Sequence, residues 1–255
     1  FSMRESSCLV QKLSHYVNLH EKERSVLSKL ERSDQTLPRN SSLYQGGRPL
    51  EALYVVKEGW LFASTLLADG RRQITRFFYP GDVVGLTQIP YTHLTHDVET
   101  STDAVICPFP KRHLDEVLVS SPRLGALLWT LAAVEQTTFL DRIRVLGRMR
   151  AIERIAYLLL EVESRLAITS ALRGPRRFEL PVTQTVIADS LGLTNVTVSR
   201  TFADMDREGL IRRDGSQFEL LRREALVELA EFYDRFATID TDWFPGPPPS
   251  ASIEE

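Results

Sequence analysis

The side chains best suited to chemistry lie between residues 195 and 213, where small polar residues are interleaved with arginines. If 195–208 is a helix, Val198, Phe202 and Met205 share one buried face, because they stand at i, i+4 and i+7. The residues left facing outward are then Asn195, Val196, Ser199, Arg200 and Arg207. Arginine can donate two hydrogen bonds to guanine, and serine or asparagine can reach a base or a phosphate. Such a face predicts a helix that enters the major groove of double-stranded DNA.

Two threonines and two glycines delimit the helices that must position this face. Thr183 precedes an apolar run that ends at Gly192, and Thr194 opens a second helix that Gly209 ends. Threonine hydroxyls cap the first backbone amides of a helix, and glycine accommodates the tight turn after it. Helix, short glycine turn and helix form the helix-turn-helix pattern. A plain helical hairpin is the alternative.

A basic hairpin is expected directly after the second helix. Arg212-Arg213 is followed by the turn Asp214-Gly215 and by an alternating strand at 217–220. Asp-Gly favours a tight hairpin turn because glycine tolerates a positive φ. The pattern predicts a winged helix-turn-helix whose wing lies near phosphates, although two arginines alone would be an ordinary solvated pair.

Size and composition narrow the remaining possibilities. The 255 residues suffice for one large domain or two ordinary ones. A net charge of −3, from 31 Lys and Arg against 34 Asp and Glu, argues neither for nor against nucleic acid. Two cysteines without a CxxC pair disfavour a disulfide framework and a cysteine-rich metal or iron–sulfur site. No apolar run reaches the roughly 20 residues of a membrane span, and Phe1–Val10 lacks a signal-peptide core. We therefore expect a cytoplasmic protein with no membrane contact.

Short β-prone runs separated by glycine and proline predict a small barrel or jelly roll between residues 43 and 109. The runs lie at 54–56, 61–62, 74–78, 83–84 and 105–107. Asp69-Gly70 between two of them predicts a hairpin turn. A short helix is expected ahead of them, within 20–31.

A long helix is expected after Pro122, because apolar residues recur at three- and four-residue steps as far as Leu146. Its apolar stripe is wide enough to need partners on more than one side. We expect it to cover the barrel and to pair with a copy of itself; packing within its own domain alone is the alternative. Gly147 interrupts the pattern and predicts a hinge before a second helix whose apolar face includes Ile152 and Leu166.

These patterns predict an α+β protein in five parts. The parts are an N-terminal extension (1–20), a β-barrel domain (21–121), a dimerisation helix (122–146), a winged helix-turn-helix domain (147–235) and a disordered tail (236–255). The tail contains the proline-rich run 245–249, which cannot build regular structure.

Taken together, several segments resemble the Crp/Fnr family of transcription regulators, named for the cyclic-AMP receptor protein and the fumarate–nitrate regulator. The resemblance covers about Leu43 to Leu220. It rests on LYVVKEG (53–59), DG at 69–70, QI at 73–74, PGDVVG (80–85), VETS (98–101), AIERIA (151–156) and LGLTNVTVSR (191–200). It implies a cyclic-nucleotide-binding-like sensor, a long dimerising helix and a C-terminal DNA-binding domain. It further implies a homodimer that acts on a two-fold symmetric site, responds to a signal in the barrel and contacts RNA polymerase.

The resemblance also assigns roles to side chains. It implies that Arg200 reads guanine, that Ser199 helps to read the site, and that Gln184 and Thr194 meet phosphate. Val196 replaces a glutamate that is frequent in the family and offers only an apolar contact, as to a thymine methyl. The whole expected DNA-contact set is Thr183, Gln184, Thr194, Asn195, Val196, Thr197, Ser199, Arg200, Arg212 and Arg213.

The sensor segment departs from the members that bind cyclic nucleotides. Leu86 stands where those members place a glutamate on the ribose, and Tyr91–Asp97 contains no arginine or lysine for the phosphate. A buried phosphate without a cation is costly, so cyclic AMP is disfavoured. Cys8 alone cannot hold the cluster of the oxygen-sensing branch. A small-molecule effector stays unidentified, and we expect no bound cofactor.

Other interpretations involve different chemistry. His93, His96 and Glu99 are ligand types for a metal or haem, but on a strand residues three apart face opposite sides. We expect polar loop residues there and no metal site, and a buried structural thiol rather than a redox switch at Cys107. No nucleophile–base set, P-loop or dinucleotide fingerprint is present, so we expect no enzyme. A stand-alone ligand-binding barrel or a jelly-roll enzyme is the alternative from another class.

Overall fold

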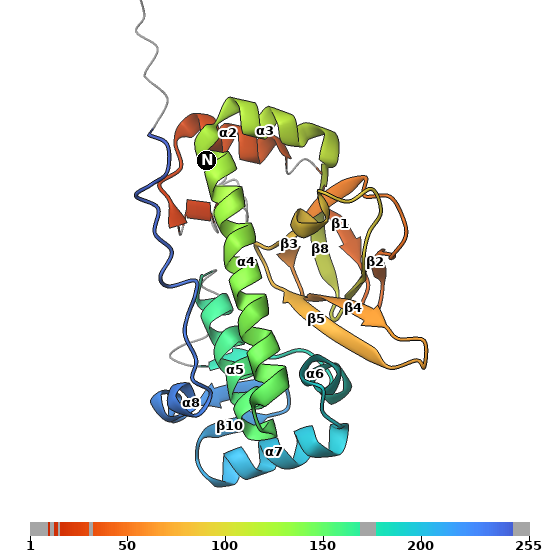
Figure 1. Ribbon diagram of the computed structural model, residues 1–255, viewed down its shortest axis with the longest axis vertical. Helices are drawn as coiled ribbons and strands as arrows, with labels where there is room; N and C mark the ends of the chain where they lie inside the picture. The colour runs from red at the N-terminus through yellow and green to blue at the C-terminus, as the bar shows by residue number, and fades with distance from the viewer. Residues whose placement is uncertain (1–9, 11–12, 15, 31–32, 169–176, 247–255) are drawn as a thin grey trace, which may run out of the picture.

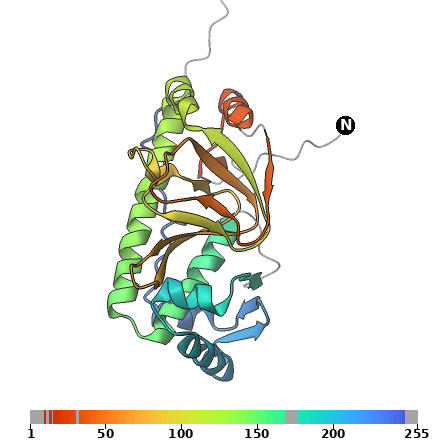
Figure 2. The ribbon, with the colours of Figure 1, turned by 90° about the vertical axis from the view of Figure 1, so that its right-hand side faces the viewer.

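The computed structural model describes residues 10, 13–14, 16–30, 33–168 and 177–246. One long helix, α4 (Pro122–Arg148), runs beside a β-sheet domain and reaches a C-terminal domain at its lower end (Figure 1). Figure 2 shows the same helix along one side of both domains. None of the helices formed by the described residues is long and apolar enough to span a membrane.

Two four-stranded antiparallel sheets form the β-sheet domain, in the orders β1-β8-β3-β6 and β2-β7-β4-β5. The strands are β1 (Gln35–Leu37), β2 (Ser42–Tyr44), β3 (Ala52–Glu58), β4 (Leu61–Leu66), β5 (Arg72–Phe78), β6 (Val83–Val84), β7 (Asp97–Thr100) and β8 (Ala104–Pro110). All five predicted β runs lie in these strands, which confirms the jelly-roll type. A closed barrel was also expected, but within the described residues the edges of the two sheets are not paired with one another.

The hairpin between β4 and β5 turns where Asp69-Gly70 predicts it. Leu67 N–H donates to the carbonyl of Arg71 over 2.8 Å, and Gly70 has a φ of 85°. The short strands β1, β2 and β7 were not predicted from the sequence, because three or four residues carry too little periodicity.

Short helices close the end of the β-sheet domain next to the start of α4. They are α2 (Glu21–Leu30), η1 (Leu86–Gln88), η2 (Lys111–His113) and α3 (Leu114–Ser120). Leu13 and Val17 are buried in the same cluster as Leu27 of α2 and Leu124 of α4. The N-terminal residues that the structure describes therefore pack into this domain.

The break between α4 and the next helix, α5 (Ala151–Ile168), lies at Met149-Arg150 and not at Gly147. Gly147 stays helical, which costs a helix interior only about 1 kcal/mol relative to alanine. Glu153 determines the position of the break, because its carboxylate accepts the Arg150 N–H over 2.8 Å and caps the start of α5. A break between the two helices is therefore present, two residues after Gly147; that it acts as a hinge stays a prediction.

The C-terminal domain packs helices on a three-stranded sheet of order β10-β11-β9. After α5 come β9 (Arg177–Glu179), α6 (Gln184–Leu191), α7 (Asn195–Arg207), β10 (Ile211–Asp214), β11 (Gln217–Leu220) and α8 (Arg223–Leu229). Phe178, Phe202 and Phe218 form its aromatic centre. Strand β9 was not predicted from the sequence, because three residues carry too little periodicity.

The chain beyond α8 follows α4 back toward the β-sheet domain (Figure 1). The sequence predicts disorder from residue 236, but Phe236 is buried and Trp243 contacts Trp129 of α4. Aromatic residues spaced along the segment supply contacts that its polar and proline-rich composition conceals. The last part of the expected tail, 247–255, lies outside the described residues.

Candidate nucleic-acid interface

Two threonine caps position α6 and α7 as the sequence predicts. The hydroxyl of Thr183 accepts the Val186 N–H over 3.3 Å, and that of Thr194 accepts the Thr197 N–H over 3.2 Å. Between them, Gly192 ends α6 with a φ of 60°, which a side chain would strain. The predicted helix, glycine turn and helix are confirmed.

The faces of α7 are also as expected. Val198, Phe202 and Met205 are at most 2% exposed and pack toward the domain core. On the opposite side Asn195, Ser199 and Arg200 are exposed, and Val196 is 77% exposed. Val196 is thus accessible for an apolar contact on this face.

Arg200 keeps its guanidinium free to engage a partner. Its side chain is 83% exposed, and its Nε lies 3.9 Å from the carboxylate of Asp204, the limit of an ion pair. Asp204 is held more closely by Arg207, one turn further along. The guanidinium of Arg200 can therefore present two donors to one acceptor pair.

The first turns of α6 and α7 lie against each other. Asn195 Nδ2 donates to Thr185 Oγ1 over 3.2 Å, and Thr194 and Thr197 join their hydroxyls over 2.9 Å. Gln184 is partly exposed at the start of α6. Backbone amides at helix starts attract anions, so this corner can hold a phosphate.

The wing separates the two arginines that the sequence presents as a pair. Arg212 is 63% exposed and forms an ion pair of 2.9 Å with Glu219. Arg213 faces the other way, and its guanidinium lies 4.9 Å from the ring centre of Phe202. Alternation along a strand explains the difference. Arg177 of β9, which the sequence did not point out, joins Arg212 on Glu219 over 3.0 Å.

We predict that Thr194→Ala lowers the free energy of unfolding by about 1 kcal/mol, because the Thr197 N–H loses its acceptor. Calorimetry of the purified variant measures this loss. Thr194→Ser keeps a hydroxyl and is the matched control. Equal stability of the two variants would contradict the capping role.

A cavity of about 690 Å³ lies between the β-sheet domain and α4, α5 and the C-terminal segment. Three arginines on its wall each pair with a carboxylate: Arg76 with Glu135 (2.6 Å), Arg142 with Glu161 (3.0 Å) and Arg165 with Asp82. Among the described residues the buried hydroxyl of Tyr79 finds no hydrogen-bond partner, and burial raises its pKa. Cationic charge on this wall is thus already neutralised by the protein.

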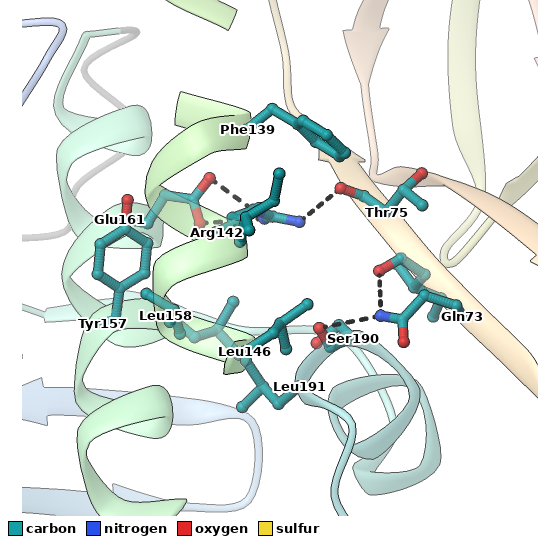
Figure 3. A pocket seen from close by; sticks show the side chains of 13 residues that line it. Gln73, Thr75, Phe139, Arg142, Leu146, Tyr157, Leu158, Glu161, Ser190 and Leu191 are labelled. Atoms are coloured by element: carbon teal, nitrogen blue, oxygen red, sulfur yellow. Dashed lines mark hydrogen bonds and ion pairs between the residues drawn. The ribbon is translucent and has the colours of Figure 1, made fainter. Parts of the chain in front are cut away.

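The two domains meet at a smaller cavity of about 140 Å³ between β5, α4, α5 and α6 (Figure 3). Arg142 donates to the carbonyl of Thr75 over 2.8 Å, and Gln73 to that of Ser190 over 3.4 Å. Beside them Arg72 and Asp189 form an ion pair of 3.0 Å. The contacts of Gln73 and Arg72 dock α6 on β5, and that of Arg142 joins α4 to β5; the sequence did not reveal them.

The residues weighed for metal or redox chemistry are dispersed. Within the described part of the chain, His, Cys, Asp and Glu form no group of three suited to a metal. His93 contacts Thr92, while Glu99 lies 3.5 Å from Arg72. Burial lowers the pKa of His96, which disfavours its charged form. The thiol of Cys107 is buried, and Cys8 lies outside the described residues.

Known proteins match both domains. The model of the cyclic nucleotide-binding domain matches residues 34–121, and that of the Crp-like helix-turn-helix domain matches 153–229. The fumarate and nitrate reduction regulatory protein of Escherichia coli is 28% identical over 225 residues, 88% of either chain.

Solved structures agree with this match. FixK2 from Bradyrhizobium japonicum has a TM-score of 0.70 and 30% identity, covering 77% of this chain and 96% of that one. TTHB099, a CRP-family transcriptional regulator from Thermus thermophilus, has a TM-score of 0.62 and 26% identity, covering 78% and 97%.

Proposed function

This chain belongs to the Crp/Fnr family of DNA-binding transcription regulators, and we propose that it acts as a homodimer on a two-fold symmetric DNA site. The observation that carries the proposal is the exposed face at the start of α7, which follows the capped helix α6 and is itself capped by Thr194. A helix presented in this way enters the major groove with its first turns at the base edges.

Each side chain of this interface has a distinct role in the proposal. Arg200 contacts guanine, Ser199 and Asn195 contact neighbouring base edges, and Val196 meets a thymine methyl. Backbone phosphates are met by Thr183, Gln184, Thr194, Thr197 and Arg212. Arg213 instead holds the wing on α7, as its stacking on Phe202 supports.

The exposed face of α4 supports pairing with a second copy. Its seam, which we define by Trp129, Ala133, Gln136, Leu140, Ile143 and Gly147, advances in alternating steps of four and three residues. All six residues are exposed, with Leu140 at 58% and Ile143 at 54%. A period of 3.5 residues is the signature of a two-stranded coiled coil. Pairing along this seam places two recognition helices about 34 Å apart.

The large cavity is the place proposed for a signal, which the sensor domain would pass to the DNA-binding domain. Leu86 lines the core, and the three wall arginines are paired with carboxylates, so a cyclic phosphate would have to displace an existing partner. This supports an effector other than cyclic AMP. The family further supports a non-enzymatic, cytoplasmic role and contact with RNA polymerase.

Selection from a random duplex pool tests the proposal. The expected result is a symmetric site with half-site centres about one helical turn apart, which the dimer geometry requires. A purified chain that is monomeric and selects a single half-site would refute it.

A further inference from the structure

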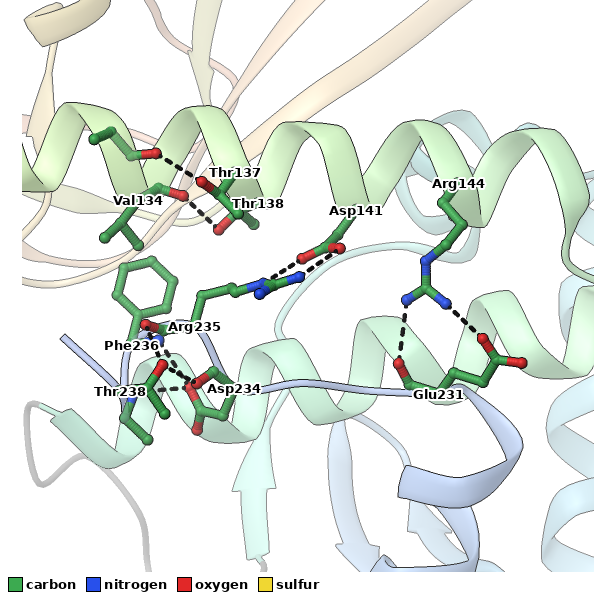
Figure 4. A network of polar contacts seen from close by, with 12 residues as sticks. Val134, Thr137, Thr138, Asp141, Arg144, Glu231, Asp234, Arg235, Phe236 and Thr238 are labelled. Carbon is green, nitrogen blue, oxygen red and sulfur yellow. Dashed lines mark hydrogen bonds and ion pairs between the residues drawn. The ribbon is translucent and has the colours of Figure 1, made fainter.

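The segment 231–244, here called the C-terminal strap, follows α8 and lies along α4 (Figure 4). We propose that this strap is a positioning element for DNA recognition: it joins α4 to α5 away from their hinge and so sets the spacing of the two recognition helices. The proposal rests on the homodimer proposed above.

The strap begins at a contact with the lower half of α4. Arg144 donates to the carboxylate of Glu231 over 2.9 Å and to its carbonyl over 3.1 Å. Glu231 has a φ of 45°, a left-handed conformation that is unfavourable for a residue with a side chain. Phe232 packs edge-on against Tyr157 of α5, with ring centres 5.3 Å apart. These contacts hold a strained turn that directs the chain onto α4.

In the middle of the strap, Asp234 and Phe236 contact α5, and Arg235 between them contacts α4. Asp234 accepts the hydroxyl proton of Ser164 over 2.7 Å, and Phe236 lies 4.1 Å from the guanidinium of Arg165. Between them Arg235 donates two hydrogen bonds to Asp141, of 2.9 and 3.2 Å. A bidentate pair of this kind specifies geometry as well as adding energy.

These contacts lie far enough from the break between α4 and α5 to restrict the angle between the two helices. Only Met149-Arg150 joins α4 to α5 covalently, and Asp141 lies eight residues before that break. Eight residues correspond to about 12 Å of helix. Any change in the angle between the helices must therefore stretch or break the contacts of Asp234, Arg235 and Phe236.

The strap is also linked to the sensor domain through Arg165. Arg165, whose guanidinium lies over Phe236, forms the buried ion pair with Asp82 and lines the large cavity together with Phe236. At the upper end, Trp243 packs edge-on against Trp129, with ring centres 5.6 Å apart. The strap thus contacts the DNA-binding domain, the dimer helix and the wall of the sensor cavity in one continuous segment.

Distance measurement between spin labels tests the strap directly. A label is placed at Asp206→Cys, an exposed site on α7, in a Cys8→Ser background; Cys107 is fully buried and does not react. The parent dimer is expected to give one narrow distribution, because its two recognition helices are held at a single spacing of about 34 Å. The pair of changes Asp234→Ala and Arg235→Ala is expected to abolish the narrow peak. Arg71→Ala, which removes an exposed ion pair in the β4–β5 turn, is expected to leave it unchanged.

The charge swap Asp141→Arg with Arg235→Asp distinguishes a positioning role from a general loss of structure. It restores the ion pair with reversed polarity and should therefore restore the narrow peak. A narrow peak that survives Asp234→Ala and Arg235→Ala would overturn the proposal. An absence of dipolar coupling in the parent protein would instead refute the dimer. In that case two labels on one chain, at Val119→Cys and Asp206→Cys, test the role of the strap. The distribution of distances between these two labels must broaden in the variant with Asp234→Ala and Arg235→Ala.

Discussion

Leu140→Glu is expected to convert the dimer into monomers and to abolish binding to a symmetric DNA site. Leu140 lies in the middle of the α4 seam, where a parallel partner would bring its own copy directly opposite. The variant would bury two facing carboxylates without a cation, and an uncompensated buried charge costs about 3–5 kcal/mol. Sedimentation velocity measures the loss of the dimer.

The single chain should tolerate this change, because Leu140 is 58% exposed before pairing. Circular dichroism checks that the fold is retained. The matched control is Val119→Glu, which introduces the same charge at a residue of α3 that is 84% exposed and lies off the seam. A Leu140→Glu protein that stays dimeric would place the interface on another surface.

Arg200→Ala is expected to weaken specific binding by about 1–3 kcal/mol for each half-site, so by about 2–6 kcal/mol over a symmetric site. The guanidinium is 83% exposed and only loosely engaged by Asp204, so little protein structure depends on it. Its loss removes a bidentate contact with a base and spares most contacts with phosphate. Fluorescence anisotropy compares the selected duplex with a scrambled one.

Arg207→Ala is the matched control for Arg200. It removes the same side chain from the far end of the same helix, where Arg207 is 72% exposed and also pairs with Asp204. We expect the control to retain sequence preference. An equal loss of affinity by Arg200→Ala on both duplexes would reassign Arg200 to a phosphate contact.

The recognition helix was predictable from sequence because the signals that define it act locally. The hydroxyls of Thr183 and Thr194 accept hydrogen bonds from amides only three residues ahead. Gly192 adopts the positive φ that the turn after α6 requires. The buried and exposed faces of α7 follow from helical periodicity alone. The family resemblance added roles for individual side chains, and it required no knowledge of distant contacts.

The sensor cavity was not predictable in the same way. The sequence shows that Leu86 and the segment 91–97 lack the groups expected for a cyclic nucleotide. It does not show that Arg76, Arg142 and Arg165 line one cavity, because these arginines are far apart in the chain. Their carboxylate partners are also distant from them in the sequence. Arg165 and Asp82, for example, are 83 residues apart.

By itself the sequence determined the longer elements, their order and the side chains of the reading face, since hydrogen-bonded turns and helix periods are set within a few residues. The tertiary structure decided which arginine of Arg212-Arg213 faces outward, and that residues beyond 230 bind α4 and α5. Aromatic packing and ion pairs of this kind depend on where distant segments meet. The composition and the local spacing of residues do not indicate which distant segments come into contact. For this reason the start of the segment that the sequence predicts to be a disordered tail is part of the C-terminal strap in the folded protein.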